Sequence, residues 1–389
     1  MKTNTRHIRT KLRLLLTVPV LLAGVHSAPA GLLTLGITLT NNQALLDWPA
    51  AGTDFALQSS TNLASTNWMF ATDALPATYG SDIAMTVTNA STTRFFRLIS
   101  LSLTTPDGMA LIPAGSFTMG NSIGDGDITD ANPTNVYISA FYMDTNLVSS
   151  NLWATVYAYA TSHGYSFSFP GMGKASNQPV QYVTWYDVVK WSNARSGQAG
   201  LTPVYYTDAG MTQIYTNGGN GTVVYANWTA NGYRLPTEAE WEKAARGGLT
   251  GQRFPWGDTI SETQADYNGN TSISYDLGPT GYNPIGDYPA TTPGTSPVGS
   301  FPANGYGLND MAGNVEEWCW DWYAGTPYPT GSPYLGGDDP RGPASGSERV
   351  LRGGAWYFNA TLARCAHRDG NYVPFTAQNY IGFRCVRGL

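Results

Sequence analysis

Histidine is scarce in this chain of 389 residues. Of its four histidines, His7 and His26 lie within the first thirty residues, which leaves His163 and His367 for the remainder. Two histidines so far apart cannot supply a three-histidine metal site, so the sequence argues against zinc-hydrolase and histidine-rich iron chemistry.

Cysteine is equally sparse, with Cys319, Cys365 and Cys385 as the only thiols. In an oxidising compartment two of them could form a disulfide and leave the third free. The sequence leaves the pairing open, and we expect Cys365 with Cys385 as the preferred pair.

Charge is also in short supply, because only 12% of residues are Asp, Glu, Lys or Arg and the formal net charge is −6. Removing an N-terminal leader that holds five bases and no acid brings this charge to about −11. An acidic chain without a Lys/Arg cluster is a poor nucleic-acid binder, since phosphate neutralisation supplies most of that affinity. We therefore expect no nucleic-acid partner.

Long apolar runs are missing beyond the N-terminus, where residues 1–30 read as an export signal. An apolar run at 14–25 precedes Ala28-Pro29-Ala30, a small-x-small cleavage pattern. The run is about a dozen residues, short for a membrane span. We expect a secreted or extracytoplasmic protein, in the periplasm or at the cell surface, with no membrane contact after cleavage; an uncleaved anchor is the alternative. The basic residues before the run are Lys2, Arg6, Arg9, Lys11 and Arg13.

Two domains are predicted after the leader. Residues 31–103 alternate short apolar segments with turn residues, which favours a small all-β sandwich that acts as a binding module or as a spacer. Residues 104–389 form the second domain. It opens with a strand, a Pro113-Ala114-Gly115 turn and a second strand, which predicts a hairpin, and an acidic loop at 125–130 is expected to be solvated.

Three helices are predicted in the second domain. Residues 149–162 and 184–196 have apolar residues at helical spacing, each after a Ser or Thr that can act as an N-cap. Thr237 precedes Glu238-Ala239-Glu240, with Glu240 placed for a capping box, and Gly247 follows the predicted end.

Several motifs of this domain resemble the formylglycine-generating enzyme, or sulfatase-modifying factor, family. The resemblance implies an α+β, loop-rich domain related to C-type lectins, here preceded by the small all-β sandwich. The motifs lie at residues 108–120, 233–248, 254–258, 305–318, 352–358, 364–366 and 381–385.

The resemblance also implies structural calcium, in which a loop is cross-linked by carboxylate and carbonyl oxygens. Matching the family motif places side-chain oxygens at Asp310 and Glu317 and backbone carbonyls at Gly313 and Val315. A first family site would take Asn268, the Gly269 carbonyl and Asp287, although the spacing to Asp287 departs from the family pattern. Carboxylates that cap turn amides without metal are the alternative.

The catalytic cysteine pair of the family's oxidases is missing from its expected place. Those enzymes bind copper through two thiolates shortly after the Gly-Gly, because thiolates select Cu(I). Here Ala355 takes the position of the family's serine and Phe358 that of the first cysteine, so copper is not expected. Cys365 could instead act as a nucleophile with His367 nearby, although a disulfide or a buried thiol is the preferred interpretation.

The sequence therefore predicts an exported, calcium-stabilised binding scaffold of this family that is not an oxidase, with a protein segment or a glycan as partner. The alternative is a formylglycine-generating-type oxidase that acts on a cysteine of a client sulfatase, or a thiol activity at Cys365. The oligomeric state stays open. Aromatic residues that could contact a partner or fill the core are Trp256, Trp318, Trp320, Trp322, Tyr323, Trp356 and Tyr357.

Overall fold

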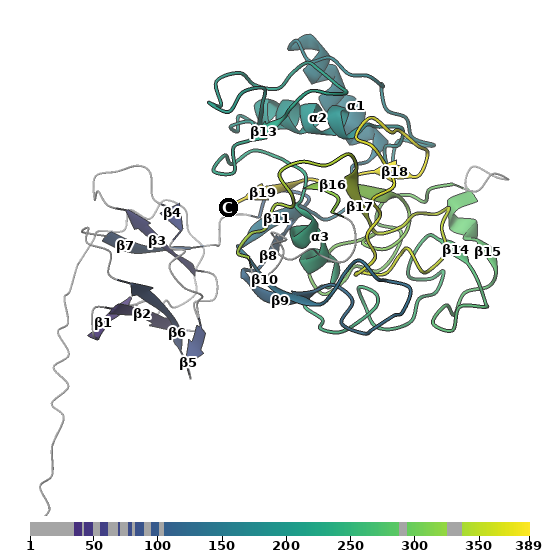
Figure 1. Ribbon diagram of the computed structural model, residues 1–389. Coiled ribbons are helices and arrows are strands. Elements are labelled where there is room, and N and C mark those ends of the chain that lie inside the picture. Colours follow the sequence, from purple (N-terminus) through teal and green to yellow (C-terminus); the bar gives the residue numbers. More distant parts are fainter. Residues whose placement is uncertain are drawn as a thin grey trace, which may run out of the picture. The chain divides into compact units, whose positions relative to one another are not determined.

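The computed structural model divides the chain into two compact units, residues 1–104 and 105–389 (Figure 1). In the second unit the structure describes residues 105–287, 294–324 and 337–389. In the first unit it describes residue 35 and the seven strands between 36 and 100. The predicted export signal at 1–30 lies outside the described residues. Within them, no helix is long and apolar enough to cross a membrane.

The first unit forms two antiparallel sheets. One has the strand order β1-β2-β6-β5 and the other β4-β3-β7. Leu46 and Trp48 of β2, Leu57 of β3 and Met85 of β6 share one buried cluster, so residues from both sheets contribute to it. The predicted sandwich packing of these sheets stays a prediction. The strands are β1 (Gly36–Thr40), β2 (Gln43–Pro49), β3 (Phe55–Ser60), β4 (Met69–Phe70), β5 (Ala77–Tyr79), β6 (Asp82–Thr88) and β7 (Phe95–Ser100).

The second unit opens differently from the prediction. Strands β8 (Met109–Ile112) and β9 (Gly115–Met119) do not pair with each other: β8 pairs with β11 (Phe141–Asp144), and β9 pairs with β10 (Thr134–Ile138). The predicted hairpin is wrong because a two-residue hairpin loop needs a positive φ at its first residue, whereas Pro113 fixes φ near −65°. The chain therefore passes from one sheet to another at Pro113.

The three predicted helices are confirmed, together with their caps. Helix α1 (Ser150–Ser162) is capped by Ser149 and α2 (Trp185–Gln198) by Thr184. Helix α3 (Glu238–Ala245) begins with a capping box formed by Thr237 and Glu240. Helices α1 and α2 pack through the stacked rings of Trp153 and Trp191, whose centroids are 5.5 Å apart.

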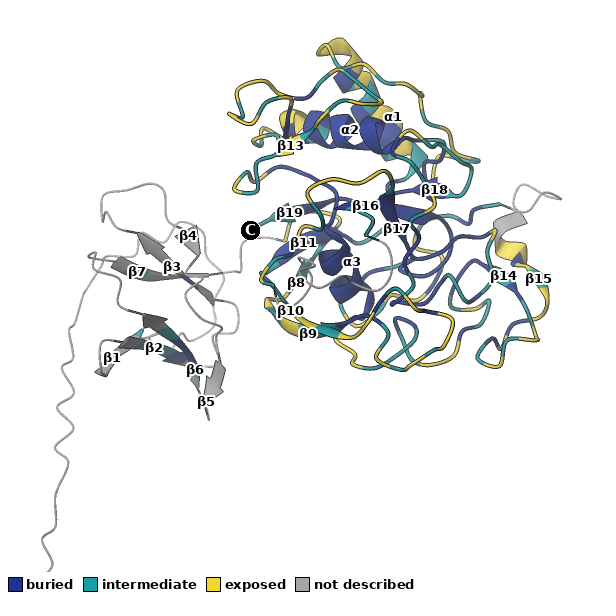
Figure 2. Ribbon diagram, in the orientation of Figure 1, coloured by how far each residue is buried: buried dark blue, intermediate teal, exposed yellow. Residues whose placement is uncertain are grey.

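Apart from the seven-residue β16, the remaining strands are short, and long loops join them around a buried interior (Figure 2). The sheet β17-β16-β18 lies at the centre of the site described below; β16 pairs antiparallel with β17 and parallel with β18. The other elements are β12 (Tyr205–Tyr206), β13 (Tyr225–Ala226), β14 (Asn268–Gly269), β15 (Gly281–Tyr282), the 3₁₀ turn η2 (Pro284–Asp287), β16 (Glu316–Trp322), β17 (Arg349–Arg352), β18 (Ile381–Gly382) and β19 (Val386–Gly388).

Candidate functional site

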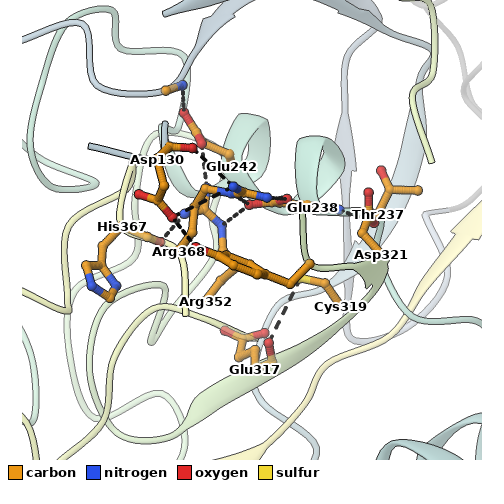
Figure 3. A network of polar contacts seen from close by, with 12 residues as sticks. Asp130, Thr237, Glu238, Glu242, Glu317, Cys319, Asp321, Arg352, His367 and Arg368 are labelled. Carbon is orange, nitrogen blue, oxygen red and sulfur yellow. Dashed lines mark hydrogen bonds and ion pairs between the residues drawn. The ribbon is translucent and has the colours of Figure 1, made fainter. Parts of the chain in front are cut away.

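Buried ion pairs join helix α3 to the end of β17 (Figure 3). Arg352, the last residue of β17, pairs with Glu242 and lies 3.6 Å from a carboxylate oxygen of Glu238. Arg368 also binds Glu238, with an Nε–Oε1 distance of 2.5 Å. Glu242 accepts a further hydrogen bond from the backbone N of Gly120 at 2.6 Å. Because these side chains are shielded from solvent, the network fixes the position of the chain that follows Arg352.

The two residues after Arg352, Gly353 and Gly354, form a turn whose backbone angles and close packing only glycine can adopt. Gly353 has φ +93° and Gly354 has φ +65°, both in the left-handed region. A Cβ on Gly354 would lie 2.9 Å from the carbonyl carbon of Leu362, which real contacts do not tolerate. The turn also accepts a hydrogen bond through Gly353 O from Gly313 N at 2.7 Å. The Gly-Gly pair therefore sets the direction in which residues 355–358 leave the core.

Aromatic rings gather where this segment leaves the core. Tyr357 is 48% exposed and lies between Tyr282, itself 38% exposed, and Tyr380. The planes of Tyr357 and Tyr380 are 14° apart, with centroids at 5.7 Å; those of Tyr357 and Tyr282 are 26° apart, with centroids at 6.4 Å. We name this set of touching rings the ring patch, and its members are Tyr282, Trp356, Tyr357, Phe358, Tyr372 and Tyr380.

Phe358 and Trp356 anchor the ring patch to the domain. Phe358 is half-buried and packs edge-on against Tyr380 at 5.1 Å, while its carbonyl accepts a hydrogen bond from Asn268 N. Trp356 is only 7% exposed and donates its indole N–H to Asn379 O at 3.1 Å. The Phe358 ring thus occupies the position that the family resemblance assigns to the first cysteine of the oxidases.

The predicted disulfide between Cys365 and Cys385 is wrong: these two residues and Cys319 are free, buried thiols. Cys385 belongs to the cluster around α1 and α2, whereas Cys365 belongs to the cluster around α3. Cys385 instead contacts the Ser192 hydroxyl, with an S–O distance of 3.6 Å. Each thiol fills a separate place in the apolar core.

The surroundings of Cys365 do not favour a nucleophile. Burial raises the pKa of its thiol to about 12, even though Arg246 and Arg352 act in the opposite direction. Burial, reinforced by the charges of Arg364 and Arg352, lowers the pKa of His367 to about 3. A neutral imidazole beside a protonated, solvent-shielded thiol lacks the thiolate that such chemistry needs.

The arginines near Cys365 are engaged by acids, some of which come from the acidic loop. Arg364 binds Asp127 at 2.6 Å and Asp125 at 2.9 Å, and Arg253 binds Asp125 at 2.7 Å. The expectation that this loop is solvated holds for residues 126, 127 and 129, which are exposed, but it missed that arginines distant in sequence bind the carboxylates of Asp125 and Asp127. Burial opposes ionisation of Asp125, but the hydrogen bonds from Arg253 and Arg364 prevail and lower its pKa.

The loop with the predicted calcium ligands, residues 310–317, leads into β16 and contacts Asp266 and Gly299. Asp310 and Gly313 have positive φ angles of 56° and 77°. Asp310 accepts a hydrogen bond from Gly299 N at 2.7 Å, and Glu317 accepts one from Arg384 Nε at 2.7 Å. The second carboxylate oxygen of Glu317 is buried without a hydrogen bond of standard geometry, although the Trp241 indole N–H, itself unpartnered, lies close enough to oppose the rise that burial causes in the pKa of Glu317. Outside the strand pairing, no described backbone N–H donates to Gly313 O or Val315 O.

Three residues of this region were missed by the sequence reasoning: Asp266, Ser296 and Asn314. Each has a buried side-chain oxygen without a hydrogen-bond partner. Asn314 N donates to Asp266 O at 2.7 Å, and the Asn314 amide reaches Ser296 O at 3.3 Å. Burial raises the pKa of Asp266 well above its usual range, and the charge of Asp310 adds to this rise. In the described ranges, no three His, Cys, Asp or Glu side chains are grouped so that they could hold a metal.

The other predicted calcium site is only partly described. Asn268 and Gly269 form β14 and pair with Tyr282 and Gly281. Asp287 ends η2, and its side chain lies outside the described residues. The next carboxylate along the chain after β14 is Asp276, which accepts hydrogen bonds from Asn270 N at 2.7 Å and Gly278 N at 2.9 Å. The structure thus brings together Asn268 and Gly269 but shows no third ligand.

Glu316 stands one residue before Glu317, where the family often has tryptophan. It is fully buried, and although its carboxylate oxygens make no hydrogen bond of standard geometry, the Asp369 carboxyl lies close enough to share one with it. Burial raises its pKa well above the usual range, and the neighbouring carboxyl of Asp369 adds to this rise. The same burial also raises the pKa of Asp369. We expect these two acids to share a proton at neutral pH.

The aromatic residues proposed as contacts divide between core and surface. Trp318 is completely buried, and Trp320 packs against Tyr205 and Trp185. Trp322 covers the guanidinium of Arg349, which lies 3.4 Å from its ring centroid. Of the seven, Tyr357 is the one counted among the exposed large side chains.

Comparison with known proteins identifies the domain. Residues 96–389 match the sulfatase-modifying factor enzyme 1-like domain. The chain belongs to the sulfatase-modifying factor family. The formylglycine-generating enzyme of Thermomonospora curvata is 34% identical over 303 residues, which cover 72% of this chain and 93% of that protein. Treponema denticola variable protein 1, a solved structure, is 28% identical with a TM-score of 0.55, covering 77% of this chain and 97% of that one.

The sulfatase-modifying factor domain also occurs within larger proteins. The serine/threonine-protein kinase pkn1 of Chlamydia caviae is 33% identical over 282 residues, which cover 72% of this chain but only 38% of that kinase. Relatives with such different names share one domain, so membership of the sulfatase-modifying factor family establishes the fold and leaves the activity to the residues of the site.

Proposed function

We propose that this protein is an exported sulfatase-modifying factor homologue that binds a partner, a protein segment or a glycan, without oxidising it. The observation that carries the proposal is the replacement of a thiol by a ring: Phe358 packs into the ring patch where a copper-binding cysteine is expected. A phenyl ring can neither ligate copper nor exchange a disulfide.

The thiols that the chain does possess support the same proposal. Cys319, Cys365 and Cys385 are all buried and free. Burial raises the pKa of Cys365 and of Cys385 to about 12, and it also raises that of Cys319 well above its usual range. Metal binding and nucleophilic attack both need thiolate, so each of these residues is held in the unreactive form.

The experiment that tests the proposal is an oxidase assay. The purified protein is incubated with Cu(I), oxygen and a sulfatase peptide that contains the target cysteine, and the peptide mass is followed. We expect the peptide to retain its thiol. The formylglycine-generating enzyme of Thermomonospora curvata is the positive control. Conversion of the thiol to an aldehyde would establish the alternative, an oxidase acting on a sulfatase cysteine.

We also propose that calcium stabilises the loop at residues 310–317. The side chains of Asp310 and Glu317 and the carbonyls of Gly313 and Val315 would hold the ion, whose role there is to cross-link the loop. The buried oxygen of Glu317 that makes no hydrogen bond of standard geometry supports this proposal, because a buried acceptor is costly unless a donor or a cation satisfies it.

Removal of calcium should therefore lower the melting temperature. We expect millimolar calcium to raise it by several degrees above that in EDTA, because an ion that binds only the folded state stabilises that state. The Asp310→Ala variant should melt at the same temperature in both buffers, while Asp208→Ala, which alters an exposed acid away from this loop, should keep the wild-type response. Equal melting of the wild type in both buffers would contradict the assignment.

A further inference from the structure

The ring patch has a chemistry that selects among possible partners. Its rings lie in residues 280–285, 356–361 and 371–380, and residues 268–272 adjoin them through the backbone pairing of Asn268 and Gly269; these four segments contain no Lys, Arg, Asp or Glu. Their polar groups are amides and hydroxyls, contributed by Asn, Gln, Ser, Thr and Tyr. Within these segments the patch offers apolar ring faces and neutral hydrogen-bonding groups, and the acids closest to one of its rings, Glu316 and Asp369, lie buried behind Tyr372.

We propose that the ring patch is a binding site for a neutral glycan, and this inference rests on the proposed non-oxidase binding function. One face of a sugar ring carries only C–H groups, and this apolar face stacks on an aromatic ring, while the hydroxyls at the sugar's edge need neutral donors and acceptors. Tyr357 is the most exposed ring of the patch, at 48%, and it stacks against Tyr380 and against Tyr282, which is itself 38% exposed, so these rings present one fixed aromatic surface to solvent. Rings fixed in this way lose little conformational entropy when a ligand stacks on them.

The hydroxyl groups of the patch fit the same ligand. The Tyr372 and Tyr380 hydroxyls are 3.1 Å apart and satisfy each other. Those of Tyr282 and Tyr357, the two exposed rings, make no hydrogen bond to any described residue. Each phenol can therefore both donate to and accept from a sugar hydroxyl beside the stacked face.

Other partners that stack on aromatic rings fit less well. Nucleic-acid bases also stack on such rings, but their binding sites add Lys and Arg for the phosphates, and none occurs in these four segments. Protein interfaces combine Tyr and Trp with Arg as binding anchors, and no Arg occurs in these segments. A patch that has tyrosines but no charge in its segments favours an uncharged, hydroxyl-rich ligand.

The test uses the purified full-length protein on an array of neutral and acidic glycans, followed by calorimetry with the strongest neutral hit. We expect saturable binding that Tyr357→Ala weakens by about tenfold or more, since one stacked ring contributes on this scale. Tyr357→Phe should stay within about threefold of the wild type, because it keeps the stacking face. Tyr225→Ala is the matched control: Tyr225 is also exposed, at 36%, but lies in β13 and has no part in the ring patch.

Three results would overturn the inference. They are the absence of any neutral glycan hit, a preference for acidic glycans, and wild-type affinity in both Tyr357→Ala and Tyr282→Ala. The failure of this inference can be distinguished from failure of the proposed function. A peptide that binds through Tyr357 and keeps its thiol would refute the glycan and leave the binding function standing, whereas an aldehyde product would refute the binding function itself.

Discussion

Two adjacent glutamates of β16 should respond to the same substitution with opposite changes in stability. Glu316 and Glu317 are 0% and 1% exposed. Glu317 has a cation at 2.7 Å, Arg384, whereas Glu316 faces the carboxyl of Asp369 and the phenol of Tyr372. We predict that Glu316→Gln stabilises the protein at alkaline pH and that Glu317→Gln destabilises it.

The sign for Glu316 follows from proton linkage. Its folded pKa is raised by burial and by Asp369, so the folded state binds the proton more tightly than the unfolded state does. The stability that this proton contributes is fully present below the unfolded pKa, near 4.5, and is lost as the pH rises through the folded pKa. Glutamine carries no titrating proton and can donate to Asp369. The advantage of Glu316→Gln should therefore grow with pH, to about 1–3 kcal/mol at pH 8.

The magnitude for Glu317 follows from its ion pair. Removing one member of a buried pair leaves the other charge uncompensated, which costs about 3–5 kcal/mol. Urea unfolding followed by tryptophan fluorescence, in EDTA and at several pH values between 5 and 9, measures both effects. If Glu316→Gln destabilised the protein equally at pH 5 and pH 8, or if Glu317→Gln were neutral, this account of the two environments would be refuted.

Two further predictions concern the interior of the domain. Arg352→Met should lower the free energy of unfolding by about 3–5 kcal/mol in urea titrations, because it leaves the buried carboxylates of Glu238 and Glu242 without this cation; a loss below about 1 kcal/mol would contradict the role of the network. The three buried thiols should react with a thiol reagent at neutral pH only in denaturant, and rapid native modification of Cys365 would contradict the raised thiol pKa.

The sequence predicted those parts of the fold that depend on local chemistry. The capping residues Ser149, Thr184 and Thr237 marked three helix starts correctly, because an N-cap acts within one turn of the chain. The hairpin at Pro113 failed because strand partners are chosen by distant segments, although the fixed φ of proline was a signal against it.

The candidate site was harder to predict, because its residues meet only in the folded chain. Tyr282 and Tyr380 join Tyr357 from segments far away in sequence, and no periodicity connects them. The disulfide prediction failed for a related reason: counting cysteines says nothing about which core cluster each one enters. The assignment of Phe358 to the position of the first oxidase cysteine needs only the distance along the chain from the Gly-Gly turn, and it stays a prediction.

The buried ion pairs before the Gly353-Gly354 turn hold the backbone in place, whereas the exposed side chains come from the residues after the turn. Arg352 is held by helix α3 from inside the domain, while Tyr357 projects outward from the far side of the turn. Side chains at the rim can therefore be exchanged without disturbing the support beneath them. Under the proposed binding function, substitutions at positions 357 and 282 should change which ligand the domain binds while leaving the buried ion pairs intact.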